Sequence, residues 1–260
     1  MIAYTRSGSG EPLVLLHALG TDRHMWDPVI ERLASEREVF AVDMPGFGES
    51  ATTSPSAPTD LARAIATGLD LERPHVAGNS LGGWVALELA LAGHARSVTA
   101  IAPAGMWARP LLPKRSLARS VARALRPALS ALLRSARARR IALGGTIAHP
   151  EHVPYAAALQ LVRAYANAPG FDAVNDGMRA NVFTGLGEIE VPLTLAWPEH
   201  DRLVARPRTV PAVAREFRLS GCGHMPTWDD PELVARVLLA GSTLAPRDVE
   251  LAAEQDRDAG

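Results

Sequence analysis

Short apolar runs alternate with longer stretches of helical periodicity along most of the chain. The apolar runs cover residues 13–16, 38–42, 76–77, 97–102 and 191–197, and a shorter, less distinct run covers 217–219. Apolar residues at helical spacing predict helices near 28–36, 59–69, 81–92, 206–213 and 231–240. This alternation predicts an α/β fold with a mostly parallel central sheet and helices on both of its faces.

Residues 104–186 interrupt this alternation. The stretch has no strand-like run, shows helical patterning and contains no acidic residue before Glu151. We therefore expect a core formed by residues 1–103 and 187–241, with 104–186 inserted as a helical cap over the ends of the strands. Residues 242–260 are polar and charged, and we expect them to form a frayed tail.

Length and composition fit one large globular domain, since the 260 residues are 47% hydrophobic and carry a formal net charge of −1. The near-neutral balance predicts no nucleic-acid partner and no membrane partner, and it leaves the oligomeric state open. The single cysteine, Cys222, excludes an internal disulfide and argues against a cysteine metal site. With no apolar signal core and no run of about 20 apolar residues, a cytoplasmic location is expected.

The most informative segment is Gly78-Asn79-Ser80-Leu81-Gly82, between an apolar run and an amphipathic helical stretch. A serine with a glycine two positions away on each side fits a sharp strand-to-helix turn, which strains its backbone and pushes its hydroxyl outward. A Cβ atom at either glycine would collide across so tight a bend. In this strand–turn–helix setting the pattern predicts that Ser80 is a nucleophile.

A serine hydroxyl needs a base to take its proton, and the base needs an orienting partner. The predicted base is His224, in a loop after the last apolar run, and the other histidines are expected to be structural or exposed. The predicted acid is Asp201, in the loop after the run at 191–197, with Glu199 and Asp43 as alternatives. The chain order Ser80, Asp201, His224 is that of one hydrolase architecture.

A tetrahedral intermediate requires two backbone N–H groups that point at its negative oxygen. By position, one is the N–H of Leu81, directly after Ser80, and the other lies in the loop His17-Ala18-Leu19-Gly20 after the first apolar run. We expect His17 to cap its strand and to hydrogen-bond this loop without taking part in the chemistry.

From about residue 13 to residue 239 the chain resembles the α/β-hydrolase superfamily. The matching segments are His17-Ala18-Leu19-Gly20, Asp43-Met44-Pro45-Gly46-Phe47-Gly48-Glu49-Ser50, Gly78-Asn79-Ser80-Leu81-Gly82-Gly83, residues 197–201 and Gly223-His224-Met225-Pro226. The resemblance implies the α/β-hydrolase fold with a helical cap, and it assigns Ser80 as nucleophile, His224 as base, Asp201 as acid, and Leu19 with Leu81 as oxyanion donors.

Two positions depart from the family pattern, because Ala18 and Pro198 stand where glycines are usual. Residues 17–27 look like those of 3-oxoadipate enol-lactonases, which is a hint about the substrate. Relatives on this fold that open epoxides or remove halide use an aspartate nucleophile, so the serine favours attack on a carbonyl carbon.

The sequence therefore predicts a serine hydrolase that cleaves a small or medium carboxylic ester or lactone through an acyl-enzyme. Its expected partner is that small molecule alone, and no cofactor or metal is needed. One alternative is a carbon–carbon bond hydrolase for β-diketones with the same triad. Another is a slow-turnover ligand receptor on the same fold, and a further one is a haloperoxidase-like side activity.

The expected cap contains a row of cationic residues: Arg115, Arg119, Arg123 and Arg126 share one helical face, and Leu117, Val121 and Leu125 lie elsewhere on the same helix. We interpret the arginine face as solvated. An electropositive lid for an anionic substrate and a lid that rests on a membrane or a partner are the alternatives. Trp107 and Met225 are candidate residues of the substrate pocket.

Overall fold

The computed structural model describes residues 1–50 and 56–243, and within them seven strands form one sheet in the order β1-β3-β2-β4-β5-β6-β7. The strands are β1 (Tyr4–Ser7), β2 (Pro12–Leu16), β3 (Glu38–Val42), β4 (His75–Asn79), β5 (Ser97–Ile101), β6 (Leu193–Pro198) and β7 (Arg215–Leu219). Of these, β1 pairs antiparallel with β3, and every other pairing is parallel. The expectation of a mostly parallel sheet is confirmed.

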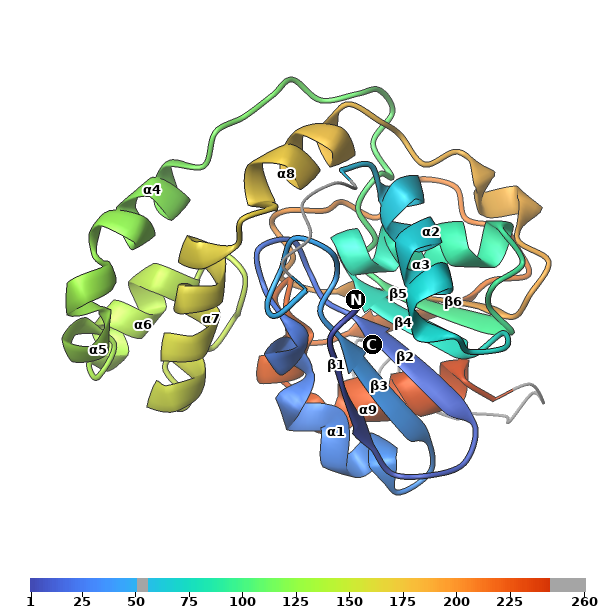
Figure 1. The fold of residues 1–260 in the computed structure, drawn as a ribbon, viewed down its shortest axis with the longest axis horizontal. Coiled ribbons are helices and arrows are strands. Elements are labelled where there is room, and N and C mark those ends of the chain that lie inside the picture. Colours follow the sequence, from blue (N-terminus) through green and yellow to red (C-terminus); the bar gives the residue numbers. More distant parts are fainter. Residues whose placement is uncertain (51–55, 244–260) are drawn as a thin grey trace, which may run out of the picture.

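Helices cover both faces of this sheet (Figure 1). The helices α1 (Asp27–Ala34) and α9 (Pro231–Gly241) pack together on one face, and α2 (Pro58–Leu69) and α3 (Leu81–Leu91) pack together on the other. Alternate residues of β2 supply the two cores: Val14 and Leu16 join the α2–α3 cluster, whereas Leu13 and Leu15 join the α1–α9 cluster. The period-two side-chain direction of a strand thus feeds both layers.

Three expectations about elements need correction. Residues 206–213 form no helix, because Pro207 and Pro211 disfavour helical backbone at and before their positions. The antiparallel strand β1 was not anticipated, since its side chains are mostly exposed and carry no apolar pattern. Helix α3 is not amphipathic but buried almost all round, because it lies between the sheet and α2.

The first residues after helix α9 also differ from the expectation of a frayed tail. Ser242 is buried, and it accepts hydrogen bonds from Arg37 at its Oγ (3.1 Å) and at its carbonyl oxygen (2.9 Å). It therefore belongs to the fold and not to a frayed tail. Residues 244–260 of the expected tail lie outside the described residues.

Between β5 and β6 the chain forms a series of helices. They are α4 (Leu117–Ala124), α5 (Leu129–Leu132), α6 (Ala136–Leu143), α7 (Tyr155–Asn167) and α8 (Phe171–Arg179), with short 3₁₀ turns η2 (Arg126–Ala128) and η3 (Gly185–Glu188). Figure 1 shows α4, α5 and α6 at one end of the molecule, with α7 between them and the sheet. None of the helices in the described residues has the length and apolar character needed to cross a membrane.

The interpretation of the arginine row as a solvated face is wrong for Arg119, which is buried. Its guanidinium donates to the carbonyl oxygens of Tyr165 (3.1 Å) and Ala168 (2.5 Å) and to the Asp172 carboxylate (2.9 Å). It also lies 4.7 Å from the centre of the Phe171 ring. Arg119 thus ties α4 to the end of α7 and the start of α8, where it donates to two carbonyl groups near the C-terminus of α7.

We expect Arg119→Met to destabilise the protein by about 2–3 kcal/mol, because it removes the hydrogen bonds to two carbonyl oxygens and to the Asp172 carboxylate. The matched control is Arg123→Met, on an exposed residue without an ion-pair partner among the described residues, which should change stability by less than about 0.5 kcal/mol. Thermal unfolding measures both, and the Arg119 variant should melt roughly 5–10 °C lower. Equal melting temperatures would contradict this role of Arg119.

Candidate active site

Ser80 lies at the sharp turn between β4 and α3, with φ 57° and ψ −114°. This positive φ is costly for a residue with a side chain, so the surrounding structure must enforce it. The Ser80 N–H donates to the Ile101 carbonyl (2.9 Å), and the Ser80 carbonyl accepts from the N–H groups of Trp84 and Ala104 (both 3.0 Å). These three hydrogen bonds fix the backbone of the turn.

The two glycines of the motif are required by close backbone contacts. A Cβ atom on Gly78 would collide with the carbonyl of Gly82, and a Cβ atom on Gly82 would collide with the carbonyl of Leu16. Both neighbours are backbone atoms, which cannot move aside as a flexible side chain can. The glycines therefore allow α3 to begin directly against β4 and β2.

His224 and Asp201, from loops far apart in the sequence, meet at a hydrogen bond of 2.7 Å between Nδ1 and Oδ2. Both side chains are buried. The other oxygen of Asp201 accepts from the N–H groups of Leu203 (2.7 Å) and Val204 (3.1 Å). Although burial alone would raise the pKa of Asp201, the hydrogen bond and charge of His224 and these two N–H groups hold it below its ordinary value.

The hydrogen bond to Asp201 determines which ring nitrogen of His224 carries the lone pair. A carboxylate at Nδ1 accepts the proton there, so Nε2 of the neutral ring carries the lone pair. Ser80 Oγ and His224 Nε2 make no hydrogen bond to each other within the described residues. Hydrogen bonds of this kind are often long before a substrate binds and shorten in the substrate complex.

Asn79 ties the serine turn to the histidine loop. Its Nδ2 donates to the carbonyl oxygens of His224 (3.0 Å) and Ile101 (3.1 Å). The backbone of His224 is therefore held against the residue that precedes Ser80. Sequence reasoning had not assigned Asn79 a role, although its place next to the serine was a usable signal.

The two expected oxyanion donors are the backbone N–H groups of Leu81 and Leu19. Leu81 is the first residue of α3, so its N–H has no partner within that helix. Leu19 lies in the loop after β2, and neither N–H donates a hydrogen bond within the described residues. The turn that contains Leu19 is closed by Thr21, whose N–H and hydroxyl both donate to the Ala18 carbonyl (3.2 and 2.9 Å).

His17 holds this loop as expected, without contacting the candidate triad through any hydrogen bond given by the described residues. Its Nε2 accepts from the Met44 N–H (3.0 Å), so the ring proton is on Nδ1, which donates to the Ala18 carbonyl (2.8 Å). Burial lowers the pKa of His17, which favours this neutral form. The imidazole thereby joins the loops that follow β2 and β3.

A second carboxylate, Asp229, binds the histidine loop to the helical segment, and sequence reasoning had missed it. Its oxygens accept from the N–H groups of Gly223 (2.8 Å), Ala148 (3.1 Å) and His149 (2.8 Å). On the other side of His224, the Met225 N–H donates to the Thr146 carbonyl (2.8 Å). Both neighbours of His224 are thus bonded to residues 146–149 or to the carboxylate that holds them.

The alternative acids are engaged elsewhere. Glu199 accepts from Arg218 (2.6 Å) and from the Gly221 N–H (2.9 Å). Asp43 accepts from the backbone and guanidinium of Arg23 (2.8 and 2.5 Å) and from the Glu49 N–H (2.8 Å). Of the three carboxylates considered, Asp201 alone has a hydrogen bond to His224 in the described part of the chain.

The two pocket candidates lie in different surroundings. Trp107 packs edge-on against Trp84, with ring centres 5.8 Å apart, and its Nε1 donates to the Asn181 carbonyl (2.8 Å). Met225 is buried in the same apolar cluster as Leu133.

Burial raises the pKa of the Cys222 thiol to about 12, which makes it a poor nucleophile.

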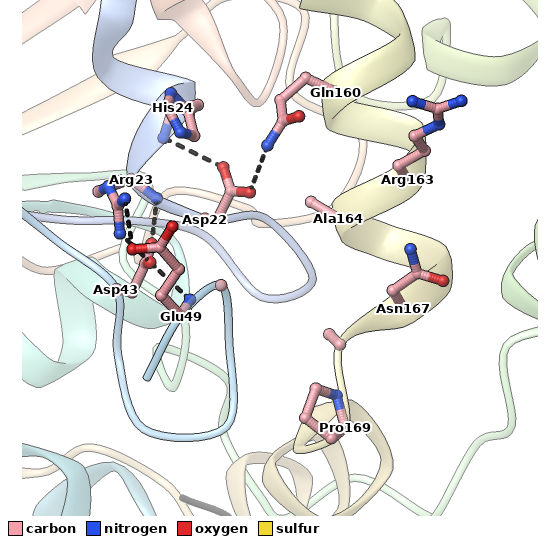
Figure 2. A pocket seen from close by; sticks show the side chains of 12 residues that line it. Asp22, Arg23, His24, Asp43, Glu49, Gln160, Arg163, Ala164, Asn167 and Pro169 are labelled. Atoms are coloured by element: carbon pink, nitrogen blue, oxygen red, sulfur yellow. Dashed lines mark hydrogen bonds and ion pairs between the residues drawn. The ribbon is translucent and has the colours of Figure 1, made fainter. Parts of the chain in front are cut away.

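A cavity of about 320 Å³ lies between α7, the 3₁₀ turn η1 (Arg23–Trp26) and the loop around Glu49 (Figure 2). Its lining is polar, and it includes neither the candidate triad nor Trp107 or Met225. Figure 2 shows Gln160 of α7 reaching Asp22 (2.9 Å), so side chains on both sides are already bonded to one another. This cavity lies beside the loop after β2, and the Gln160–Asp22 hydrogen bond links α7 to that loop.

Comparison with known proteins places the chain in a family. The model of the alpha/beta hydrolase family matches residues 13–237. The epoxide hydrolase EphH of Mycobacterium tuberculosis is 34% identical over 187 residues, which are 65% of this chain and 86% of that protein. A pimeloyl-[acyl-carrier protein] methyl ester esterase of Aeromonas hydrophila is 42% identical over 93 residues, 35% of this chain and 36% of its own length.

Solved structures show the same architecture. A bacterial membrane phospholipase A superposes with a TM-score of 0.70 at 25% identity, covering 94% of this chain and 84% of that one. The enol-lactonase from Burkholderia xenovorans superposes with a TM-score of 0.69 at 20% identity, covering 92% and 95%. The fold, the family match and these relatives agree that the chain belongs to the alpha/beta hydrolase family and is a hydrolase.

Proposed function

We propose that the protein is a serine hydrolase that cleaves a small or medium carboxylic ester or lactone through an acyl-enzyme. The observation that carries this proposal is the arrangement of one strained serine and one buried imidazole–carboxylate pair, joined through Asn79. Esterase relatives agree with this chemistry, and the enol-lactonase shares the fold.

In the proposed cycle, Ser80 Oγ attacks the carbonyl carbon while His224 Nε2 takes its proton. Asp201 stabilises the imidazolium that forms, and the N–H groups of Leu19 and Leu81 stabilise the oxyanion. Collapse of the tetrahedral intermediate expels the alcohol, which receives the proton from His224. Water activated by His224 then hydrolyses the acyl-enzyme, and protein groups and water suffice for every step.

One relative is an epoxide hydrolase, but a serine nucleophile does not suit the opening of an epoxide. A carboxylate that opens an epoxide becomes an ester, which water can hydrolyse, so the nucleophile is regenerated. A serine alkoxide that opened an epoxide would become an ether, which water does not hydrolyse, and the enzyme would stop after one turnover. Ser80 therefore favours acyl transfer over epoxide opening.

We further propose that residues 104–186 form a cap over the carboxyl ends of the strands, where reactive groups of parallel sheets collect. Backbone hydrogen bonds run between this segment and the loops after the strands: Gly170 N–H to Gly46 O (2.9 Å) and Met225 N–H to Thr146 O (2.8 Å). The Gln160–Asp22 bond adds a side-chain link. Trp107 and Met225 remain the proposed lining of the acyl pocket beneath this cap.

We expect Ser80→Ala to leave a folded protein that hydrolyses no ester, because no other group could carry the acyl chain. A panel of p-nitrophenyl esters, lactones and ring-fission dienones measures the activity and identifies the substrate class. A fluorophosphonate probe should label the native protein and not the variant. Persistent labelling would mean that another residue is the nucleophile.

We expect Asp201→Asn to lower kcat about 10³-fold or more, because the imidazole loses the anion that sets its tautomer. The matched control is Glu199→Gln, in the same loop but paired with Arg218, and its kcat should stay within about threefold of the native value. Steady-state kinetics on the best ester of the panel distinguishes the two. A large loss in the Glu199 variant with near-normal activity of the Asp201 variant would move the acid to Glu199.

Replacing His17 should affect stability in a pH-dependent way. At about pH 8, His17→Ala should cost about 3 kcal/mol, because the Met44 N–H loses its acceptor and the buried imidazole leaves a cavity. The lowered pKa of His17 means that the unfolded chain binds more protons there than the folded one, so acid destabilises the native protein through this group. Urea unfolding at several pH values from about 8 to 5 gives the free energy of unfolding of the native protein and of the variant. The difference between the two should become smaller as the pH falls. A difference that stays constant would contradict a neutral His17 in the folded protein.

A further inference from the structure

Helix α4 buries one arginine, Arg119, and exposes its apolar stripe to solvent. Arg119 points into the molecule, where it bonds to Tyr165, Ala168 and Asp172. The apolar residues at spacing four, Leu117, Val121 and Leu125, are 78%, 48% and 42% exposed. An amphipathic helix normally buries the apolar stripe against the core, so this orientation needs a reason.

The exposed apolar residues continue beyond α4. Leu112 is 83% exposed, Leu132 of α5 is 43% exposed and Ile141 of α6 is 79% exposed. Six of the eleven large hydrophobic residues that are exposed in the described residues lie between residues 112 and 141. Singly exposed apolar side chains are ordinary, but such a concentration in one short stretch marks an interaction surface. We call residues 112–141 the outer segment.

The charge of the outer segment has one sign. The segment lies within the stretch 104–150, which contains ten cationic residues and no acidic one. Several of its cations are exposed and have no ion-pair partner among the described residues: Lys114, Arg123, Arg126, Arg134 and Arg137. Since the whole chain has a formal net charge of −1, this positive charge is local to one end of the molecule.

We propose that the outer segment docks on an anionic lipid surface. Exposed leucine, valine and isoleucine side chains interleaved with arginines are the composition of helices that lie in the headgroup region of a bilayer. Each cation near such a surface adds attraction, and the aliphatic side chains insert between the headgroups. A second copy of this chain fits less well, because two outer segments face to face would bring only positive charges together.

The docking would be peripheral, since no described helix could span a bilayer. The sequence-based expectation of no membrane partner rested on the near-neutral net charge, which averages over this local concentration. Figure 1 shows α4, α5 and α6 at one end of the molecule, so a flat surface could meet these helices without touching the sheet. This inference does not depend on Ser80 being the nucleophile.

The test is sedimentation of the full chain with vesicles of phosphatidylcholine alone and of phosphatidylcholine with about 30% phosphatidylglycerol. We expect binding to the anionic vesicles, loss of binding at high salt and little binding to the neutral ones. The double variant Arg123→Gln/Arg126→Gln should weaken binding about 25-fold, at about fivefold per cation. The double variant Leu117→Gln/Ile141→Gln should weaken it at least about tenfold, because it removes two inserted side chains.

Matched controls carry the same substitutions elsewhere on the surface. Leu203→Gln/Val213→Gln alters two exposed apolar residues, and Arg208→Gln/Arg236→Gln removes two exposed charges, all outside the outer segment. Both controls, and also Ser80→Ala, should bind vesicles as the native protein does. All variants are first compared by circular dichroism and melting temperature, and the salt dependence of the native protein tests the proposal should a variant unfold.

Three results would overturn the proposal. One is the absence of binding to anionic vesicles at low salt. Another is equal weakening by the control variants, which would place the contact elsewhere. The third is self-association, seen by light scattering without lipid and abolished by Leu117→Gln/Ile141→Gln, which would make the outer segment an interface between copies of this chain.

Discussion

The positive φ of Ser80 is the constraint on which the candidate site depends. A residue with a Cβ atom adopts this backbone only where its neighbours impose it, and here three backbone hydrogen bonds and two glycines do so. Relaxing the turn would move the start of α3 away from β4 and turn the hydroxyl and the Leu81 N–H together. The proposed nucleophile and one proposed oxyanion donor are therefore held by the same strained turn, and the other candidate groups are arranged around it.

The groups around Ser80 are held by bonds between segments far apart in the sequence. Asn79 joins the serine turn to His224, and Asp229 joins the loop of His224 to residues 146–149. His17 joins the loops after β2 and β3. Each of these side chains satisfies backbone groups that a buried loop leaves without partners, so the same bonds stabilise the fold and position the site.

The sequence carries enough local information to predict the sheet, the serine turn and the loops of Asp201 and His224. Short apolar runs and glycine spacing are local signals, and they identify elements directly. The roles of Arg119, Asn79 and Asp229 escape such reasoning, because each depends on carbonyl or N–H groups that only folding brings near. The helix expected at 206–213 fails for a different reason, since apolar spacing was given more weight than Pro207 and Pro211.

The clamp formed by Asp229 has a mechanical consequence. Residues 146–149 are linked to both neighbours of His224, to Gly223 through the Asp229 carboxylate and to Met225 through the Thr146 carbonyl. A displacement of residues 146–149 would therefore shift the backbone on both sides of the imidazole. Any movement of the helical segment that includes these residues would reach the candidate base through two separate contacts.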